Sequence, residues 1–313
     1  MNPDGDALGS TLALSQALKK MGHEVYPVVP NEYPEFLQWL PGNDSVIDYY
    51  KNKEQANSII STAEMIFFLD HNESKRGGDM NEALTASKAL KIMIDHHPNP
   101  QMAVDYQISF TEASSTCELI FEFIAAIDGL TFMDKSIAEC IYTGILTDTG
   151  CFSYNSSRTR TFEIAAHLLQ YAIHKDEIYS RIYDNYSAQR MRLLGYCLNE
   201  KMVVLPDLNT AYMSITLEEQ KRFDFATGDS EGFVNYPLSI KGISFTALFT
   251  ERKDKVKISF RSRGSFPSNV FSERHFSGGG HLNAAGGESN LSLGETIQKF
   301  TELLSEYKTD LNS

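Results

Sequence analysis

Two short apolar runs, each ending in an aspartate, constrain the fold of this chain most. They are MIFFLD (65–70) and LKIMID (90–95), both rich in branched or aromatic residues. Runs of this length and composition are typical of buried parallel strands. Helical patterns surround them at 11–21, 115–127, 135–146 and 161–171, and a further strand-like run lies at 25–29. We therefore predict an α/β fold in which helices cover both faces of a parallel sheet.

The length of the chain indicates two domains. At 313 residues it exceeds the size of most single hydrophobic cores, which rarely grow beyond about 250–300 residues. A helical pattern at 187–200 is followed by a turn at Pro206, and the runs AYMSIT, ISFTALFTE and KVKISFRS then indicate further strands. We predict a first domain at 1–186, a linker helix at 187–205 and a smaller α/β domain at 206–313. The two domains are expected to face each other across a cleft.

Charge and composition exclude several classes of function. The net charge of -13 argues against a protein that holds long nucleic acid, because that mode of binding needs a basic surface. We find no apolar run long enough for a membrane span and no signal peptide, so we expect a cytoplasmic protein without a membrane partner. The four cysteines are widely spaced and are interpreted as reduced core residues. The negative net charge is compatible with a small anionic substrate that is held by metal ions. The sequence leaves open whether the chain forms a homodimer.

Carboxylates and imidazoles gather at the predicted strand ends. Open α/β sheets bind ligands beyond the carboxyl ends of their strands, and oxygen and imidazole ligands together favour manganese, iron, cobalt or zinc over calcium. Taken singly, such an aspartate is most often a turn residue or a helix cap. The combination predicts a site for one or two divalent metals, with these candidate residues: Asp4 and Asp6 (NPDGD), Asp70 (FFLDH), Asp95, His96 and His97 (MIDHH), and Asp148 (TDTG).

Three further segments carry candidate phosphate-binding groups. A strand-end arginine can clamp a phosphate, a glycine run lets backbone amides approach one, and a helix N-terminus favours negative charge. Each has a plain structural alternative, namely a solvated arginine, a flexible turn and a helix cap. The candidates are Arg261 and Ser262 (FRSRG), Gly278, Gly279, Gly280 and His281 (GGGH), and Ser115 (EASSTCELI).

As a set, these motifs resemble the DHH/DHHA1 family of phosphoesterases. NPDGDALGS, LDH, DHH and TDTG occur in the order of the DHH motifs, and RSRG with FSGGGHLNAAGG resembles the DHHA1 substrate domain. The resemblance covers nearly the whole chain. It implies that 1–186 is the metal-binding catalytic DHH domain and that 206–313 is the substrate-binding DHHA1 domain.

The resemblance also implies a role for each motif residue. Asp70 would bridge two metals, Asp4 would serve one of them, and Asp6, His96 and Asp148 would serve the other. His97 would face the substrate phosphate, and Asp95 would orient the histidines from behind. Two Mn²⁺ ions per chain are expected, with Mg²⁺ or Co²⁺ as alternatives. Arg261, Ser262, the GGGH segment and Ser115 would bind substrate.

One family feature is missing from the sequence. The family places a metal-binding histidine four residues before the first aspartate of NPDGD, which here falls immediately before Met1. Two explanations stay open, a start placed too late and a natural loss of the ligand. If the loss is natural, a non-catalytic nucleotide-binding protein is the alternative function.

Among such enzymes the two-domain layout most resembles the nano-RNases that also dephosphorylate 3′-phosphoadenosine 5′-phosphate. The resemblance thus implies a hydrolase acting on short oligonucleotides or nucleotide phosphates by a two-metal mechanism. Inorganic pyrophosphatase or polyphosphatase activity is the alternative within the family.

Overall fold

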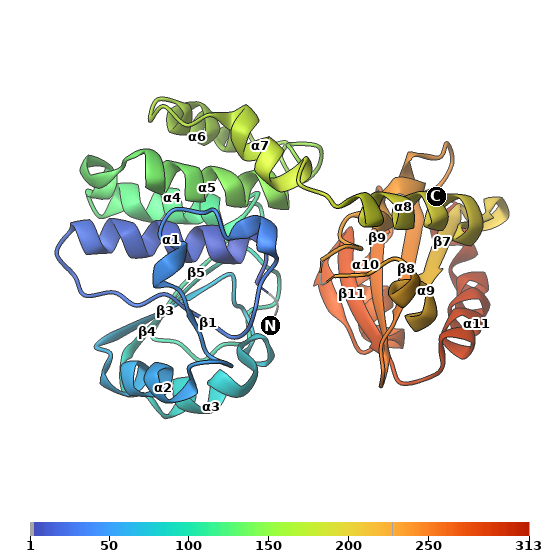
Figure 1. Cartoon of the computed structure of the whole chain (residues 1–313), viewed down its shortest axis with the longest axis horizontal. Helices are drawn as coiled ribbons and strands as arrows, with labels where there is room; N and C mark the ends of the chain where they lie inside the picture. The colour runs from blue at the N-terminus through green and yellow to red at the C-terminus, as the bar shows by residue number, and fades with distance from the viewer. Residues whose placement is uncertain (1–2, 227, 313) are drawn as a thin grey trace. The chain divides into compact units, whose positions relative to one another are not determined.

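The computed structural model describes residues 3–226 and 228–312, without the side chains of residues 74–76. The chain divides into two compact units, Met1–Asn185 and Tyr186–Ser313 (Figure 1). The segment 187–205, expected to be a linker, lies inside the second unit. There the helix α8 (Ala188–Tyr196) packs Leu193 and Leu194 into a cluster with residues of the six-stranded sheet of that unit.

The first unit is an α/β structure with short parallel sheets. Strands β3, β4 and β5 form one sheet in that order, and β1 pairs with β2 in a second, with all neighbours parallel. The elements in chain order are α1 (Gly5–Lys20), β1 (Val28–Val29), β2 (Ile47–Asp48), α2 (Lys53–Thr62), β3 (Met65–Leu69), α3 (Asn81–Ala86), β4 (Leu90–Asp95), β5 (Tyr106–Ser109), α4 (Thr116–Ala126), α5 (Lys135–Asp148), α6 (Thr159–Leu169) and α7 (Lys175–Tyr183).

Helices cover both faces of the β3–β4–β5 sheet, as the apolar strand runs predict (Figure 1). Successive side chains of a strand point to opposite faces. Phe67 and Ile94 therefore pack into the cluster formed with α1, α4 and α5, while Phe68 and Met93 pack into the cluster with α2 and α3. Burial on both faces explains why these strands carry continuous apolar runs.

Two predicted elements differ from the structure at their ends. The strand predicted at 25–29 is reduced to Val28–Val29, because Pro27 has no N–H for a ladder hydrogen bond. The helix predicted from residue 11 begins at Gly5, because Asp4 caps it by accepting from the amides of Asp6 and Ala7. The early start brings the NPDGD motif into the first turn of α1.

The second unit is built on one six-stranded mixed sheet of order β10-β11-β9-β8-β7-β6, in which only β7 and β8 are parallel neighbours among the described residues. On one face α10 and α11 enclose a cluster rich in phenylalanine that includes Phe245, Phe260 and Phe271. The elements are α8, β6 (Val203–Leu205), β7 (Thr210–Ile215), α9 (Leu217–Arg222), β8 (Phe245–Glu251), β9 (Val256–Ser262), α10 (Ser268–His275), β10 (Gly279–His281), β11 (Ala284–Ser289), α11 (Leu293–Leu304) and α12 (Lys308–Leu311).

Candidate metal centre

Asp6 is a buried carboxylate held by the start of a helix from another part of the chain. It lies in the first turn of α1 and is 1% exposed. The backbone amides of Thr116 and Cys117, in the first turn of α4, donate to its two carboxylate oxygens at 2.6 and 2.8 Å. The free amides and the dipole at a helix N-terminus stabilise negative charge. These contacts fix the position and the plane of the Asp6 carboxylate.

Asp70 follows β3 in a backbone conformation that few residues adopt. Its φ of 54° lies in the left-handed region, which aspartate and asparagine tolerate better than most side chains. The Thr116 hydroxyl donates to Asp70 Oδ1 at 3.0 Å. The same oxygen lies 3.3 Å from His97 Nδ1 and 3.8 Å from His96 Nε2. Asp70 is therefore placed between the two histidines.

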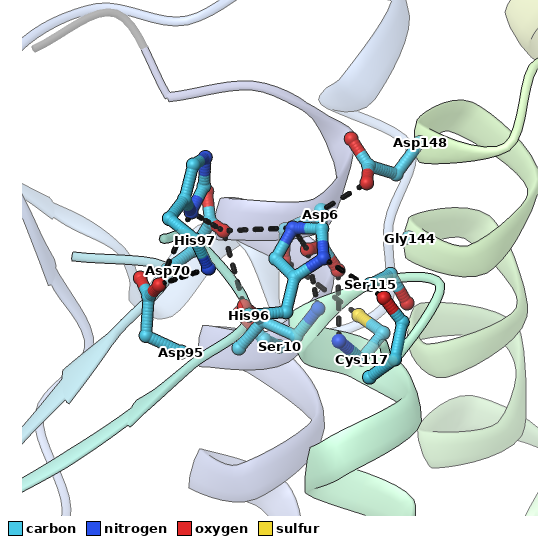
Figure 2. Close-up of polar contacts among 12 residues, drawn as sticks. Asp6, Ser10, Asp70, Asp95, His96, His97, Ser115, Cys117, Gly144 and Asp148 are labelled. Carbon is cyan, nitrogen blue, oxygen red and sulfur yellow. Dashed lines mark hydrogen bonds and ion pairs between the residues drawn. The ribbon is translucent and has the colours of Figure 1, made fainter. Parts of the chain in front are cut away.

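The two histidines follow β4, and a different oxygen atom holds each of them. His96 Nδ1 lies 3.2 Å from the Ala113 carbonyl oxygen, so a proton on Nδ1 donates to that oxygen. The lone pair of Nε2 then faces Asp6, Asp70 and Asp148, with Nε2–Oδ distances of 3.7, 3.8 and 3.4 Å (Figure 2). For His97, Asp95 Oδ1 accepts from the backbone N–H at 2.5 Å and lies 3.2 Å from Nδ1. Asp95 is thus placed to orient His97.

Asp148 does not follow a strand, which corrects the prediction from sequence. It is the last residue of α5, and its Oδ2 reaches His96 Nε2 from a helix end. A helix was predicted at 135–146, and Asp148 was nevertheless grouped with the strand ends, because a short apolar run such as GIL can precede either kind of terminus. Asp6 likewise comes from a helix, so two of the four motif segments approach the sheet edge from helices.

Glycines allow these two helices to approach closely. A Cβ atom added at Gly9 of α1 would lie 2.6 Å from the Cys140 carbonyl oxygen of α5. One added at Gly144 of α5 would lie 2.1 Å from Cys117 Sγ and 2.9 Å from Asp6 Oδ1. No side chain can occupy either position without moving a helix or the Asp6 carboxylate.

Substituting Gly144 should therefore damage stability and metal binding together. We expect Gly144→Ala to lower the free energy of unfolding by about 1–3 kcal/mol through overpacking, and to weaken metal affinity by displacing Asp6. Thermal denaturation and metal titration measure the two effects. Gly195→Ala is the matched control, because nothing lies within 4 Å of a Cβ at that helical position. Equal behaviour of the two variants would contradict the close-packing argument.

The donor set fits divalent metal ions. Two groups of ligand atoms, each within 4.8 Å, are formed by Asp6, His96 and Asp148 and by Asp70, Asp95 and His97. Burial raises the pKa of Asp6 well above its usual range, and the neighbouring carboxylates of Asp70 and Asp148 raise it further. Converging carboxylates beside an imidazole lone pair need a cation, and a histidine that donates its other N–H to a carbonyl is typical of metal ligands.

Metal binding at this centre should weaken in acid. Because the pKa of Asp6 is raised, its carboxyl group stays protonated up to a higher pH than that of a free aspartate. The bound proton then competes with the metal ion for the carboxylate. Adding Mn²⁺ to metal-free protein should raise Tm by several degrees near pH 8 but by much less near pH 5. Asp6→Asn should remove most of the gain at both pH values. An equal gain at both pH values in the parent protein would contradict this assignment.

Asp4 and Ser115 have capping contacts. Asp4 is exposed, caps α1 and lies outside both ligand groups, although its charge also raises the pKa of Asp6. The Ser115 hydroxyl accepts from the Glu118 amide at 3.1 Å and is fully buried. The start of α4 is thus occupied by the chain's own Asp6, whereas we expected a substrate phosphate there.

In the second unit, Arg261 and Ser262 lie next to each other on β9 and point to opposite faces. Arg261 belongs to the less buried face, and its Nη1 donates to the Phe260 carbonyl at 2.9 Å. Ser262 is 5% exposed, and its hydroxyl donates to the Phe266 carbonyl at 2.7 Å. The expectation that Ser262 contacts substrate is not supported, because strand alternation turns its side chain into the core.

The glycine segment is part of a strand, whereas a flexible turn was the alternative. Gly279, Gly280 and His281 form β10, which pairs with β11. A Cβ at Gly278 would lie 1.9 Å from the Gly286 carbonyl oxygen, and one at Gly280 would lie 2.5 Å from the Ala284 carbonyl oxygen. Packing alone therefore requires glycine at 278 and 280. At Gly279 the nearest atom would be 3.6 Å away, so packing leaves that position open.

Comparisons with known proteins agree with this architecture. Residues 1–145 match the DHH family, N-terminal domain, and residues 208–310 match the DHHA1 domain. The chain belongs to the DHH/DHHA1 phosphoesterase family. Helices α1 to α5 and the parallel sheets accordingly lie in its DHH domain, and β7 to β11 in its DHHA1 domain.

Several relatives cover nearly the whole chain. It is 28% identical to the bifunctional oligoribonuclease and PAP phosphatase NrnA of Bacillus subtilis, over 91% of this chain and 86% of that protein. The NrnA of Thermus thermophilus is also 28% identical, over 99% and 88%. The crystal structure of an exopolyphosphatase-related protein from Bacteroides fragilis is 44% identical, with a TM-score of 0.96 over 100% of this chain and 92% of that one.

Some supporting groups of the DHH domain could not be identified from sequence. The amides of Thr116 and Cys117 and the carbonyl of Ala113 act through the backbone, so no side-chain type marks them. Gly144 carries a weak signal, as a glycine inside a helical pattern.

In the part of the chain that the structure describes, no helix is both long and apolar enough to cross a membrane.

Proposed function

We propose that this protein is a metal-dependent hydrolase of short oligonucleotides that also removes phosphate from 3′-phosphoadenosine 5′-phosphate. The observation that carries the proposal is that Asp70 belongs to one ligand group, 3.3 Å from His97 Nδ1, and also lies 3.8 Å from His96 Nε2 of the other group. A carboxylate shared between two neighbouring groups suits a pair of metal ions. The NrnA relatives, named as oligoribonucleases and PAP phosphatases, support this substrate class.

We assign the ligands of two Mn²⁺ ions to residues of the DHH domain. Asp6, His96 and Asp148 would hold one ion, Asp4 would contribute to the other, and Asp70 would serve both. When bound, the ions supply activation of a water and stabilisation of charge on the phosphoryl oxygens. Manganese suits a mixed set of carboxylate and imidazole ligands. The distantly similar nuclease RecJ of Thermus thermophilus was crystallised in complex with Mn²⁺.

The chain's own groups orient the reacting phosphate. Asp95 Oδ1 accepts from the backbone N–H of His97 and lies 3.2 Å from Nδ1, which leaves Nε2, on the far side of the ring, for the substrate. In the DHHA1 domain, Arg261 on β9 and His281 on β10 lie in the same row across one sheet, with Ala284 of β11 between them. We assign to these two residues the binding of a second substrate phosphate. Gly279 would admit the phosphate close to the backbone.

A polyphosphatase is the second candidate function. The relative from Bacteroides fragilis is described as exopolyphosphatase-related, and at 44% identity it matches the entire chain. Polyphosphate is also a chain of phosphoryl groups that two metals and an arginine can bind. Polyphosphate has no bases, so the relative rates at which the protein hydrolyses polyphosphate and nucleotides distinguish the two functions.

A hydrolysis screen with Mn²⁺ tests the proposal. We expect turnover of oligonucleotides of about two to five residues and of 3′-phosphoadenosine 5′-phosphate, since a chain with net charge -13 gains little from a long phosphate backbone. A dinucleotide should outcompete a long single strand. Protein carrying Asp70→Asn, purified in the same way, excludes contaminating nucleases. Faster processive digestion of the long strand would indicate an exonuclease, and cleavage of polyphosphate alone would indicate a polyphosphatase.

A further inference from the structure

One half of the DHHA1 sheet is open on the face opposite the phenylalanine cluster. On that face of β8, Leu248 is buried by Phe233 and by α8, and Thr246 donates to the Val234 carbonyl at 2.7 Å. The adjoining strands are less buried there. The register places their side chains in three rows: His281, Ala284 and Arg261; Gly279, Gly286 and Ser259; Glu288 and Lys257.

Lys257 provides a second cation on this open face, four residues before Arg261 on the same strand. At about 3.3 Å per residue the two Cα atoms lie about 13 Å apart. The carboxylate directly opposite Lys257, Glu288, instead contacts Lys255, with both oxygens 2.9 Å from its Nζ. Among the described residues, Lys257 has no carboxylate within salt-bridge distance. Loss of hydration lowers the pKa of Lys257, and the positive charges of Arg252 and Arg261 lower it further, whereas the charges of Glu231 and Glu288 raise it. A bound anion would relieve this repulsion.

The row between the two cations is free of large side chains. Gly286 lies in the middle of β11 and is exposed, and a Cβ there would meet only the Ile258 carbonyl oxygen, at 3.8 Å. By contrast, a Cβ at Gly287 would lie 2.8 Å from Ser272 Oγ. Packing therefore explains Gly287 but not Gly286. Glycine weakens a strand, and an unexplained glycine inside one often marks close approach of a ligand.

We propose that Lys257 and Gly286 extend the substrate site to a second nucleotide. The inference rests on the proposed action on short oligonucleotides. Arg261 and His281 bind one phosphate, the base or ribose of the next nucleotide lies against the bare backbone of Gly279 and Gly286, and Lys257 binds the following phosphate. Ser259 lies between the two cations on β9, and its hydroxyl can hydrogen-bond to the same oligonucleotide. The length of this row favours substrates of two or more nucleotides over single nucleotides, which bind without reaching Lys257.

The test compares substrates of different length on the full protein loaded with Mn²⁺. A trinucleotide with a terminal phosphate carries three phosphates and reaches Lys257, whereas the p-nitrophenyl ester of thymidine 5′-phosphate carries one phosphate and one nucleotide. Lys257→Gln should raise KM for the trinucleotide about tenfold and leave KM for the ester within about twofold. The salt dependence of log KM should also become less steep, by about 0.7 for the lost phosphate contact. Lys253→Gln is the matched control, because Lys253 is an exposed lysine in the turn between β8 and β9.

Gly286→Val tests the bare row independently. Valine suits a strand, and no contact closer than 3.8 Å opposes its Cβ, so Tm should be unchanged or higher. KM for the trinucleotide should nevertheless rise about tenfold, because the side chain fills the space of the second nucleotide. This combination separates a lost subsite from a misfolded domain.

The outcomes are distinguishable from failure of the proposed function. If the parent protein hydrolyses the trinucleotide and both variants retain its KM, the extended subsite is wrong and the function stands. An equal rise of KM for both substrates would also overturn it, since the defect would then not depend on length. If the parent protein hydrolyses neither nucleotide substrate, the proposed function and this inference fail together.

Discussion

Replacing Asp70 with asparagine should lower turnover at least about 10³-fold, equivalent to about 4 kcal/mol of transition-state stabilisation. Asp70 belongs to one ligand group and lies 3.8 Å from His96 Nε2 of the other, so loss of its charge weakens both proposed metal positions at once. The fold should survive, because asparagine also tolerates the left-handed backbone at this position. Steady-state kinetics with Mn²⁺, together with metal content and thermal denaturation, measure the three quantities.

Asp128→Asn supplies the control for this substitution. Asp128 has a φ of 57°, close to the 54° of Asp70, but it lies in an exposed turn after α4. The two variants share the chemical change and the backbone conformation, and they differ in proximity to the proposed metals. Turnover of Asp70→Asn within about tenfold of the parent protein would overturn the two-metal assignment.

Arg261→Ala should give the second-largest effect, a rise in KM for dinucleotides on the order of a hundredfold. Charged hydrogen bonds contribute about 1.5–3 kcal/mol each, and the planar guanidinium can form two with one phosphate. Metal content should not change, because Arg261 lies in the DHHA1 domain. Arg261→Lys should recover only part of the loss, since an ammonium group retains the charge without the paired geometry.

Arg263→Ala is the comparison for Arg261. This arginine is two residues further along the chain and is exposed beyond the end of β9. It should alter KM by less than about threefold, as expected for a distant surface charge. If Arg263→Ala matched or exceeded Arg261→Ala, the phosphate contact would have to be reassigned to Arg263.

The fold was largely predictable because its strands are short and buried. The runs MIFFLD and LKIMID correspond to β3 and β4, and apolar periodicity located α4, α5 and α6 within about two residues at most ends. The strand at 25–29 failed because Pro27 interrupts it. We expected the helix at 187–205 to be a linker, but its apolar face packs on the six-stranded sheet of the second unit. Periodicity shows that a face is apolar but not which surface covers it.

For the site, sequence was informative about residue types and weak about what surrounds them. Asp70, His96 and His97 lie together, as the motif at the strand ends predicts. Asp148 was placed at a strand end, yet it reaches the same point from a helix. The contacts that hold Asp6 join residues about 110 positions apart through backbone amides. Such contacts depend on the tertiary fold, and no local pattern encodes them.

The glycine-mediated contact between α1 and α5 has a consequence for the choice of metal. Asp6 and Asp148 project from two helices that meet closely at Gly9, where a Cβ atom would lie 2.6 Å from the Cys140 carbonyl oxygen. Close-packed backbone is hard to compress or to spread. A coordination shell anchored on such a frame should discriminate between divalent cations by ionic radius, in addition to their preference for oxygen or nitrogen. Enlarging one glycine would then change the order of metal preference and not only the strength of binding.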